Sequence, residues 1–221
     1  MNPENKVIYR ITYEKCERVK YISHLDFIRC WGRAFKRAKI PVKYSNGFNP
    51  HILLNIALPC PVGVSSSCEM LDIALTQRID CEEFKNRMTA ALPDAVKVVR
   101  VEENVDMKDF YDILSASYTV EFNSSSKINL DDFNSAENVM IEKKSKRKVN
   151  EVNIKDFIRN IEISESNGTN HRLKLHINAG NFSNLKPELV IKSMEMFFDC
   201  KATDIKIERK EIYFDDMTKV C

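Results

Sequence analysis

The chain has 221 residues, of which 43% are hydrophobic and 30% are charged, and its formal net charge is +2 at pH 7. This length and composition exclude an intrinsically disordered chain and a small fold that needs disulfides in place of a core. Because the charges nearly cancel, only their distribution along the chain can indicate a partner.

Strand and helix patterns alternate through the first hundred residues. β-branched and aromatic residues predict a strand over residues 7–13, and a helix follows over residues 23–39 with Ser23 as its N-cap. Leu25, Ile28, Trp31, Gly32 and Phe35 recur at the spacing of a buried helical face. The other elements predicted in this half are strands over residues 51–58, 69–75 and 96–101 and a helix over residues 81–92.

The second half repeats this order of elements without repeating the residues. A linker helix is predicted over residues 107–114. It is followed by strands over residues 118–122, 171–178 and 205–214, helices over residues 130–139 and 188–198, and a charged ribbon over residues 140–154. Each half approximates β-α-β-β-α-β, the ferredoxin-like split unit. We therefore expect an α+β fold of two ferredoxin-like domains in tandem, residues 1–105 and residues 106–221.

The sequence also indicates where the protein works and what it lacks. No apolar run approaches the roughly 18 residues that span a bilayer, and the polar start does not resemble a signal peptide. The seven cysteines are odd in number and form no Cys-x-x-Cys pair, which favours reduced thiols and argues against a zinc or iron–sulfur site. We expect a soluble cytoplasmic protein with no metal, no cofactor and no membrane partner.

A long basic segment departs from the background composition. Residues 27–68 contain no Asp or Glu, although about six would be expected at the frequency of the whole chain. The bases of the predicted helix, Arg29, Arg33, Lys36 and Arg37, recur at intervals of three and four residues and so share one face. Such a face binds a polyanion, or it is an ordinary solvated helix surface.

The turn after this helix favours a nucleic acid as the polyanion. Its polar and aromatic candidate residues are Lys43, Tyr44, Ser45, Asn46, Phe48, Asn49 and His51. Bases stack on aromatic rings and phosphates pair with cations and amides, so this mixture suits single-stranded RNA. Asn46-Gly47 and Asn49-Pro50 are two turn signals within five residues, which predicts a rigid loop. The alternative is a turn whose aromatic rings pack into the core.

Two histidines flank the basic segment and raise a catalytic alternative. His24 follows the N-cap of the predicted helix, and His51 ends the turn. With Lys43 and Tyr44 they could act as base, acid and charge stabiliser in metal-independent RNA cleavage. The sequence does not show whether the two histidines approach each other.

The same segment resembles a known family, the radical-SAM-linked proteins. The resemblance is carried by residues 22–26 (ISHLD), 33–51 (RAFKRAKIPVKYSNGFNPH), 58–64 (LPCPVGV) and 69–72 (EMLD), and more loosely by residues 148–154 (KVNEVNI). The family is a bacterial domain of unknown function found beside or fused to radical SAM proteins with a B12-binding-type domain. Two positions depart from its pattern: Ile52 replaces a usual Pro, and Asn153 replaces a usual Asp.

The resemblance implies a partner class and no reaction of its own. With the acid-free segment, it leads us to expect a non-catalytic RNA-binding accessory protein that presents substrate to a radical SAM enzyme. The alternatives are a ferredoxin-like endoribonuclease using His24 and His51, and a protein-interaction module that docks on an acidic enzyme surface.

Overall fold

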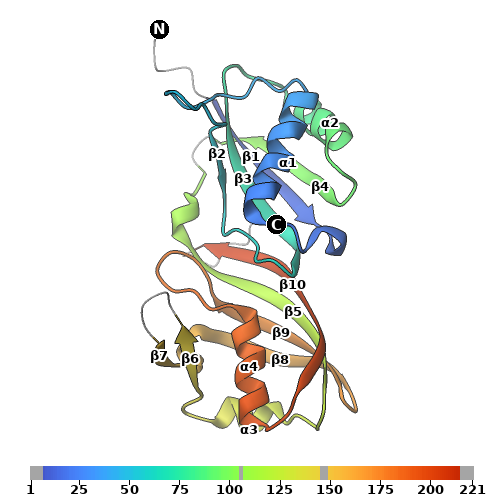
Figure 1. The fold of residues 1–221 in the computed structure, drawn as a ribbon, viewed down its shortest axis with the longest axis vertical. Helices are drawn as coiled ribbons and strands as arrows, with labels where there is room; N and C mark the ends of the chain where they lie inside the picture. Colours follow the sequence, from blue (N-terminus) through green and yellow to red (C-terminus); the bar gives the residue numbers. More distant parts are fainter. Residues whose placement is uncertain (1–6, 105–106, 145–148, 215–221) are drawn as a thin grey trace. The chain divides into compact units, whose positions relative to one another are not determined.

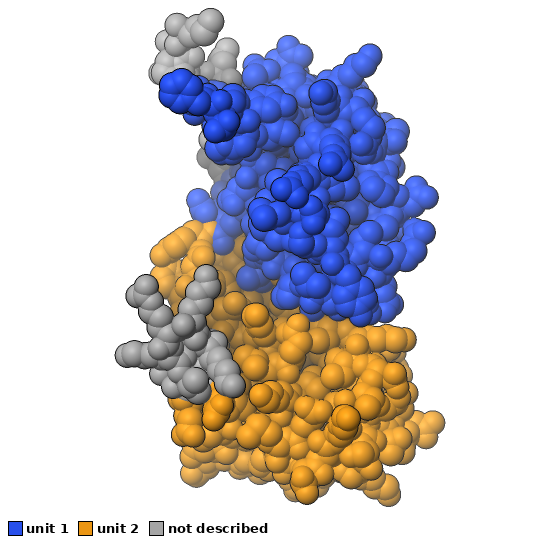
Figure 2. All heavy atoms as spheres, viewed as in Figure 1, with its two compact units in different colours: residues 1–110, 221 blue, residues 111–220 orange. Residues whose placement is uncertain are grey.

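A computed structural model describes residues 7–104, 107–144 and 149–214 of the chain (Figure 1). The chain divides into two compact units, which are residues 1–110 with Cys221 and residues 111–220 (Figure 2). The described residues form ten strands and four α-helices, so the predicted α+β class is confirmed.

Unit 1 is an antiparallel sheet with two helices. Its elements are β1 (Val7–Lys15), α1 (His24–Arg37), β2 (Leu54–Ile56), β3 (Val64–Leu75), α2 (Cys81–Ala91) and β4 (Val96–Glu103). The strands lie in the order β4-β1-β3-β2, and each neighbouring pair is antiparallel.

One face of the unit 1 sheet carries the core. Tyr9 pairs with Ile73 and Ile11 pairs with Leu71 across β1 and β3, so these side chains share a face. They belong to one buried cluster with the helix residues Phe27, Trp31, Ala34, Phe35, Phe84 and Met88. Both helices therefore cover the same side of the sheet, as Figure 1 shows.

The predicted start of α1 is confirmed, and its predicted buried face is only partly right. Ser23 caps the helix, because its hydroxyl oxygen accepts a hydrogen bond from the Asp26 backbone N–H at 3.2 Å. Trp31 and Phe35 are buried as predicted, but Leu25 is 65% exposed. Leu25 occupies the first turn, beyond the end of the stripe formed by the core residues.

Unit 2 repeats this arrangement with one insertion. Its elements are β5 (Ile113–Ser124), α3 (Leu130–Ser135), β6 (Met140–Lys144), β7 (Val149–Asn153), β8 (Ile158–Asn167), β9 (Asn170–Asn178), α4 (Pro187–Phe197) and β10 (Ala202–Phe214). The main strands lie in the order β10-β5-β9-β8 with antiparallel neighbours, and β6 and β7 form a separate hairpin.

Three predicted elements differ from those observed. Residues 107–114 contain no linker helix, only a 3₁₀ turn at Phe110–Asp112, and β5 begins at Ile113. The strand predicted over residues 51–58 is reduced to β2, because residues 51 and 53 bond back to residues 45 and 43. β8 was not predicted, since Ile161 is its one buried residue and its sequence lacks an apolar row.

Cysteine state and membrane length were the other expectations that bear on the fold. Cys16, Cys30, Cys60, Cys81 and Cys200 are free thiols. Cys68 is disulfide-bonded, so the expectation of reduced thiols is wrong for this residue. Among the described residues, no helix has both the length and the apolar character needed to cross a membrane.

Candidate nucleic-acid interface

The basic residues of α1 lie on its solvent face. Because Phe27, Trp31 and Phe35 anchor one side of the helix in the core, residues spaced around the opposite side remain in water. The side chains predicted to form the basic face, Arg29, Arg33, Lys36 and Arg37, are all exposed.

Arg29 has an acidic partner on its own helix. Its guanidinium Nη1 lies 2.8 Å from Asp26 Oδ1, and the Ser23 hydroxyl donates to Asp26 Oδ2 at 2.7 Å. The Ser23 hydrogen bond and then Arg29 lower the pKa of Asp26, which keeps this carboxyl ionised. Arg29 therefore brings less net charge to the surface than its exposure suggests.

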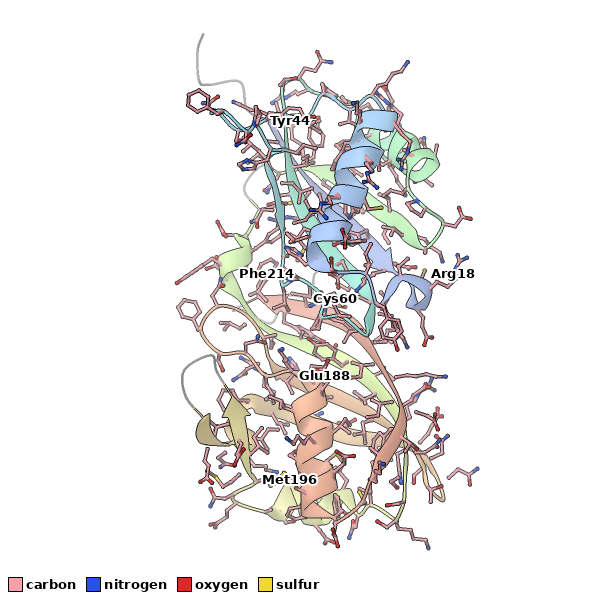
Figure 3. All side chains as sticks on the ribbon, viewed as in Figure 1. Arg18, Tyr44, Cys60, Glu188, Met196 and Phe214 are labelled. Atoms are coloured by element: carbon pink, nitrogen blue, oxygen red, sulfur yellow. The ribbon has the colours of Figure 1, made fainter. Side chains whose placement is uncertain are left out.

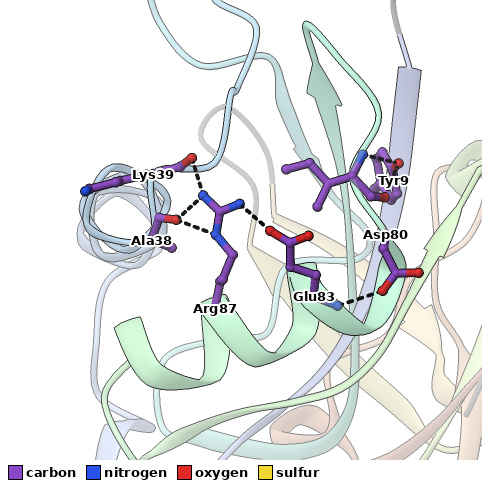
Figure 4. Close-up of polar contacts among 7 residues, drawn as sticks. Tyr9, Ala38, Lys39, Asp80, Glu83 and Arg87 are labelled. Carbon is purple, nitrogen blue, oxygen red and sulfur yellow. Dashed lines mark hydrogen bonds and ion pairs between the residues drawn. The ribbon is translucent and has the colours of Figure 1, made fainter.

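Arg37 is engaged by the neighbouring helix. Its Nη2 donates to the backbone oxygen of Ala91, the last residue of α2, at 2.6 Å. The relation is reciprocal, since Arg87 of α2 donates to the backbone oxygens of Ala38 and Lys39 just beyond the end of α1 (Figure 4). Each arginine satisfies carbonyl groups that the end of the other helix leaves without intrahelical partners.

Arg33 and Lys36 are the bases of α1 best placed for an external anion. Within the described part of the chain, neither side chain forms a hydrogen bond or an ion pair. The same holds there for the Lys43 ammonium, which follows α1 by six residues. The charge available to a partner is thus concentrated in fewer side chains than the sequence indicated.

Residues 44–52 form a closed loop at the end of a short ladder. Tyr44 and Ile52 form an isolated antiparallel bridge. The Ser45 N–H donates to the His51 backbone oxygen at 2.8 Å, and the His51 N–H donates to Ser45 Oγ at 3.1 Å. Ser45 Oγ also lies 2.8 Å from His51 Nδ1. These contacts agree with the rigid loop predicted from the two turn signals, and they give Ser45 and His51 a structural role at its base.

The aromatic residues of the loop are not core residues. Phe48 is 105% exposed and Tyr44 is 49% exposed, which contradicts the alternative that Phe48 packs inside. Asn46 and Asn49, on either side of Phe48 in the chain, are exposed as well. In Figure 1 the segment between α1 and β2 projects beyond the sheet of unit 1. A fully exposed aromatic ring on a tied loop is available for stacking.

A glycine lets the base of this loop approach α1. A Cβ placed on Gly32 would lie 3.4 Å from the Ile52 Cδ1 atom, so a larger side chain here would push against Ile52. The exposed basic side of α1 and the base of the loop are therefore parts of one continuous surface. We call Arg33, Lys36 and residues 43–51 the α1–loop surface.

The structure does not bring His24 and His51 together. His24 is the first residue of α1 and lines a small cavity with Cys60. His51 lies beside Tyr44 at the loop, and Figure 3 shows Tyr44 and Cys60 at opposite ends of unit 1. A helix of 14 residues is about 21 Å long. One phosphodiester bond cannot be served by both histidines in this arrangement.

The cavity beside His24 contains charged residues that sequence reasoning missed. Lys15 is 2% exposed and Glu69 is 1% exposed, although Glu69 was interpreted as an ordinary strand-edge charge. The Lys15 ammonium donates to the backbone oxygens of Lys20 at 3.3 Å and Val64 at 3.2 Å. Cys60 Sγ donates to the same Val64 oxygen at 3.3 Å. The signal in the sequence was the position of Glu69 in the alternating row of Leu71, Ile73 and Leu75.

Metal-ligating side chains do not gather in the described residues. No group of three or more His, Cys, Asp or Glu residues there could hold a metal ion. Asp72, the acid nearest to Glu69 in the sequence, forms a bidentate ion pair with Arg10 instead, with both N–O distances at 2.8 Å.

Comparison with known proteins identifies a family and no activity. A solved structure titled "Crystal Structure of an Unknown Protein from Galdieria sulphuraria" is 9% identical, and the match covers 92% of this chain and 98% of that one. Its TM-score is 0.26, too low to support any inference. No curated protein matches the chain. A family model matches residues 8–187, and the chain therefore belongs to the family described as "Uncharacterized protein conserved in bacteria (DUF2344)".

Proposed function

We propose that the protein binds single-stranded RNA through the α1–loop surface and works as a non-catalytic accessory protein. The observation that carries the proposal is the full exposure of Phe48 at the tip of a loop tied by Ser45 and His51. Exposure of an aromatic ring to water is unfavourable, and a tied loop loses little entropy when a ligand orders it. Both properties suit a stacking platform for nucleic-acid bases.

The charge beside this ring supports the same ligand. Arg33, Lys36 and Lys43 can contact phosphates, and residues 27–68 supply no acidic side chain to oppose them. Phosphate contacts position a strand while stacked bases add affinity, so cations beside an exposed aromatic ring are complementary in function.

The order of elements supports assigning each unit as a ferredoxin-like domain. Unit 1 has the strand order β4-β1-β3-β2, and unit 2 has the corresponding order β10-β5-β9-β8 once the β6–β7 hairpin is set aside. This is the split β-α-β-β-α-β arrangement, with helices against one sheet face. The radical SAM enzyme as partner follows from the family resemblance alone and belongs to the proposal on that basis.

Binding of a labelled 12-nucleotide RNA to full-length protein tests this function. We expect Phe48→Ala to weaken binding about 10-fold, because loss of stacking costs about 1–3 kcal/mol per base. The matched control is Phe182→Ala, which removes a 68%-exposed phenylalanine of unit 2 that pairs with Tyr111. Thermal melts of both variants establish that they remain folded.

The same experiment separates the rival functions. Equal RNA affinity in the parent and Phe48→Ala proteins would remove the stacking platform. No salt-dependent RNA binding at all would favour the protein-interaction module. Cleavage of the bound RNA, abolished by either His24→Ala or His51→Ala, would favour the endoribonuclease.

A further inference from the structure

A groove lies on the face of the unit 1 sheet that the helices leave uncovered. Its volume is about 390 Å³, and it is lined by Ile8, Leu53, Leu54, Asn55, Asp72, Ala74 and Asp109. Ile8 pairs with Ala74 across β1 and β3, and both alternate with core residues such as Tyr9 and Ile73. Because alternate side chains of a strand point to opposite faces, Ile8 and Ala74 face away from α1 and α2.

The lining combines an apolar floor with hydrogen-bond acceptors at the rim. Ile8, Leu53, Leu54 and Ala74 provide apolar surface, whereas Asn55 and Asp109 are exposed. The third polar group, Asp72, is fixed by Arg10 and by the Asn104 side-chain amide, which donates to Oδ2 at 2.9 Å. A flat apolar ring with N–H donors along one edge matches such a lining in shape and polarity.

The sign of the charge determines which part of an RNA strand can enter. Two carboxylates at the groove repel phosphate, whereas Arg33, Lys36 and Lys43 of the α1–loop surface attract it. A strand held at the α1–loop surface would therefore direct a base, and not its backbone, into the groove.

The groove begins where the α1–loop surface ends. Leu53 follows the Tyr44–Ile52 bridge directly, and its N–H donates to the Lys43 backbone oxygen at 2.9 Å. Phe48 precedes Leu53 by five residues, which limits the chain path between them to about 17 Å. A short single strand can contact both places, since related sheets bind about 4–16 nucleotides.

We propose that this groove binds a guanine base of the RNA strand, with Asp109 accepting hydrogen bonds from its Watson–Crick edge. The proposal rests on the proposed RNA-binding function. Guanine presents two adjacent donors, the ring N1–H and the exocyclic amino group, to which a carboxylate is a bidentate acceptor. Uracil presents one donor between two acceptors. A carboxylate offers about four acceptor positions, so contacts within the protein leave capacity for the base.

The test compares two RNAs and two matched variants of the full-length protein. One RNA is a 12-nucleotide uridine tract and the other carries a single central guanosine, with affinities measured by fluorescence anisotropy. We expect the parent to bind the guanosine RNA about 10-fold more tightly, the value of one good bidentate base contact. Asp109→Asn should reduce this ratio to below about 2-fold while leaving the uridine-tract affinity within about 2-fold of the parent, because a single mispositioned donor cannot replace the carboxylate. Asp94→Asn removes an exposed carboxylate that does not line the groove and should keep the full ratio.

A change in the RNA gives the same answer without any change in the protein. Inosine lacks the exocyclic amino group of guanosine, so replacing the central guanosine by inosine should remove most of the preference. Equal binding of the guanosine and uridine RNAs by the parent, or an unchanged preference in folded Asp109→Asn, would overturn the guanine site and leave RNA binding intact. Failure of the parent to bind either RNA would overturn the proposed function, and with it the guanine site.

Discussion

At the scale of the residue, Asn153 shows what an amide does that a carboxylate cannot. Its Oδ1 accepts from the backbone N–H groups of Val139 and Lys155, and its Nδ2 donates to the Glu137 backbone oxygen and to Asn138 Oδ1. The acid usual in the radical-SAM-linked family at this position would place a carboxylate against two oxygen atoms. We predict that Asn153→Asp lowers the free energy of unfolding by about 1–2 kcal/mol in urea titrations. Asn134→Asp, an exposed substitution in α3, is the control and should change it by less than about 0.5 kcal/mol.

At the scale of the element, the contact between α1 and α2 predicts a stability effect. Arg87 donates to two backbone oxygens at the end of α1 and to the Glu83 carboxylate. Arg87→Met keeps the length of the side chain and removes these donors, so we expect a loss of about 2–3 kcal/mol of unfolding free energy. Arg78→Met is the comparison, because Arg78 is 75% exposed and pairs only with Glu103 among the described residues. A surface pair contributes about 0–1 kcal/mol, and equal losses in the two variants would contradict the capping role.

The solvent face of α1 makes a second prediction at this scale, about salt. Phosphate contacts release counterions, so RNA affinity should fall steeply with salt concentration. Arg33→Ala combined with Lys36→Ala should weaken binding and reduce the slope of log affinity against log salt by about two contacts. Lys97→Ala with Arg100→Ala removes the same charge from β4, where the partners are Glu14 and Glu102, and should leave the slope unchanged. A slope reduced equally by both pairs would show that only net charge matters.

At the scale of the whole molecule, two histidines of unit 2 link stability to pH. His171 is buried between Ser124 and Ser166, and burial lowers its pKa. Burial, and then the charge of Arg159, lowers the pKa of His176. Below about pH 6.5 the unfolded chain binds protons that the folded chain does not, so this stability is complete above pH 6.5 and is lost as the pH falls toward the folded-state pKa values.

Urea titrations at several pH values between about 7.5 and 5.5 measure this effect. We expect the free energy of unfolding of the parent to decrease over this interval by up to about 1.4 kcal/mol per pH unit for each histidine. His171→Gln should reduce that pH dependence, and the exposed His51→Gln should not. An unchanged pH profile in folded His171→Gln would exclude His171 as a source of the effect.

Local signals in the sequence were sufficient for the elements and insufficient for the site. Ser23 and Pro187 marked the starts of α1 and α4, because N-caps and first-turn prolines act within one helical turn. The acceptor for Arg37 lies 54 residues away at Ala91, and no local pattern reports such a contact. The burial of Glu69 is equally long-range, since it depends on pairing of β3 with β1. The loop could be predicted because its turn residues act locally, whereas the groove could not, because its lining comes from four separate segments.

The exchange of arginines between α1 and α2 limits how far α1 can be treated as a module. Arg37 ends on α2 and Arg87 ends on α1, so each helix carries the terminal cap of the other. Transplanting α1 alone onto a different scaffold would leave its last carbonyl groups open and release Arg37 as a mobile cation. The two helices are therefore a single graftable unit, and any redesign of the basic face has to carry α2 with it.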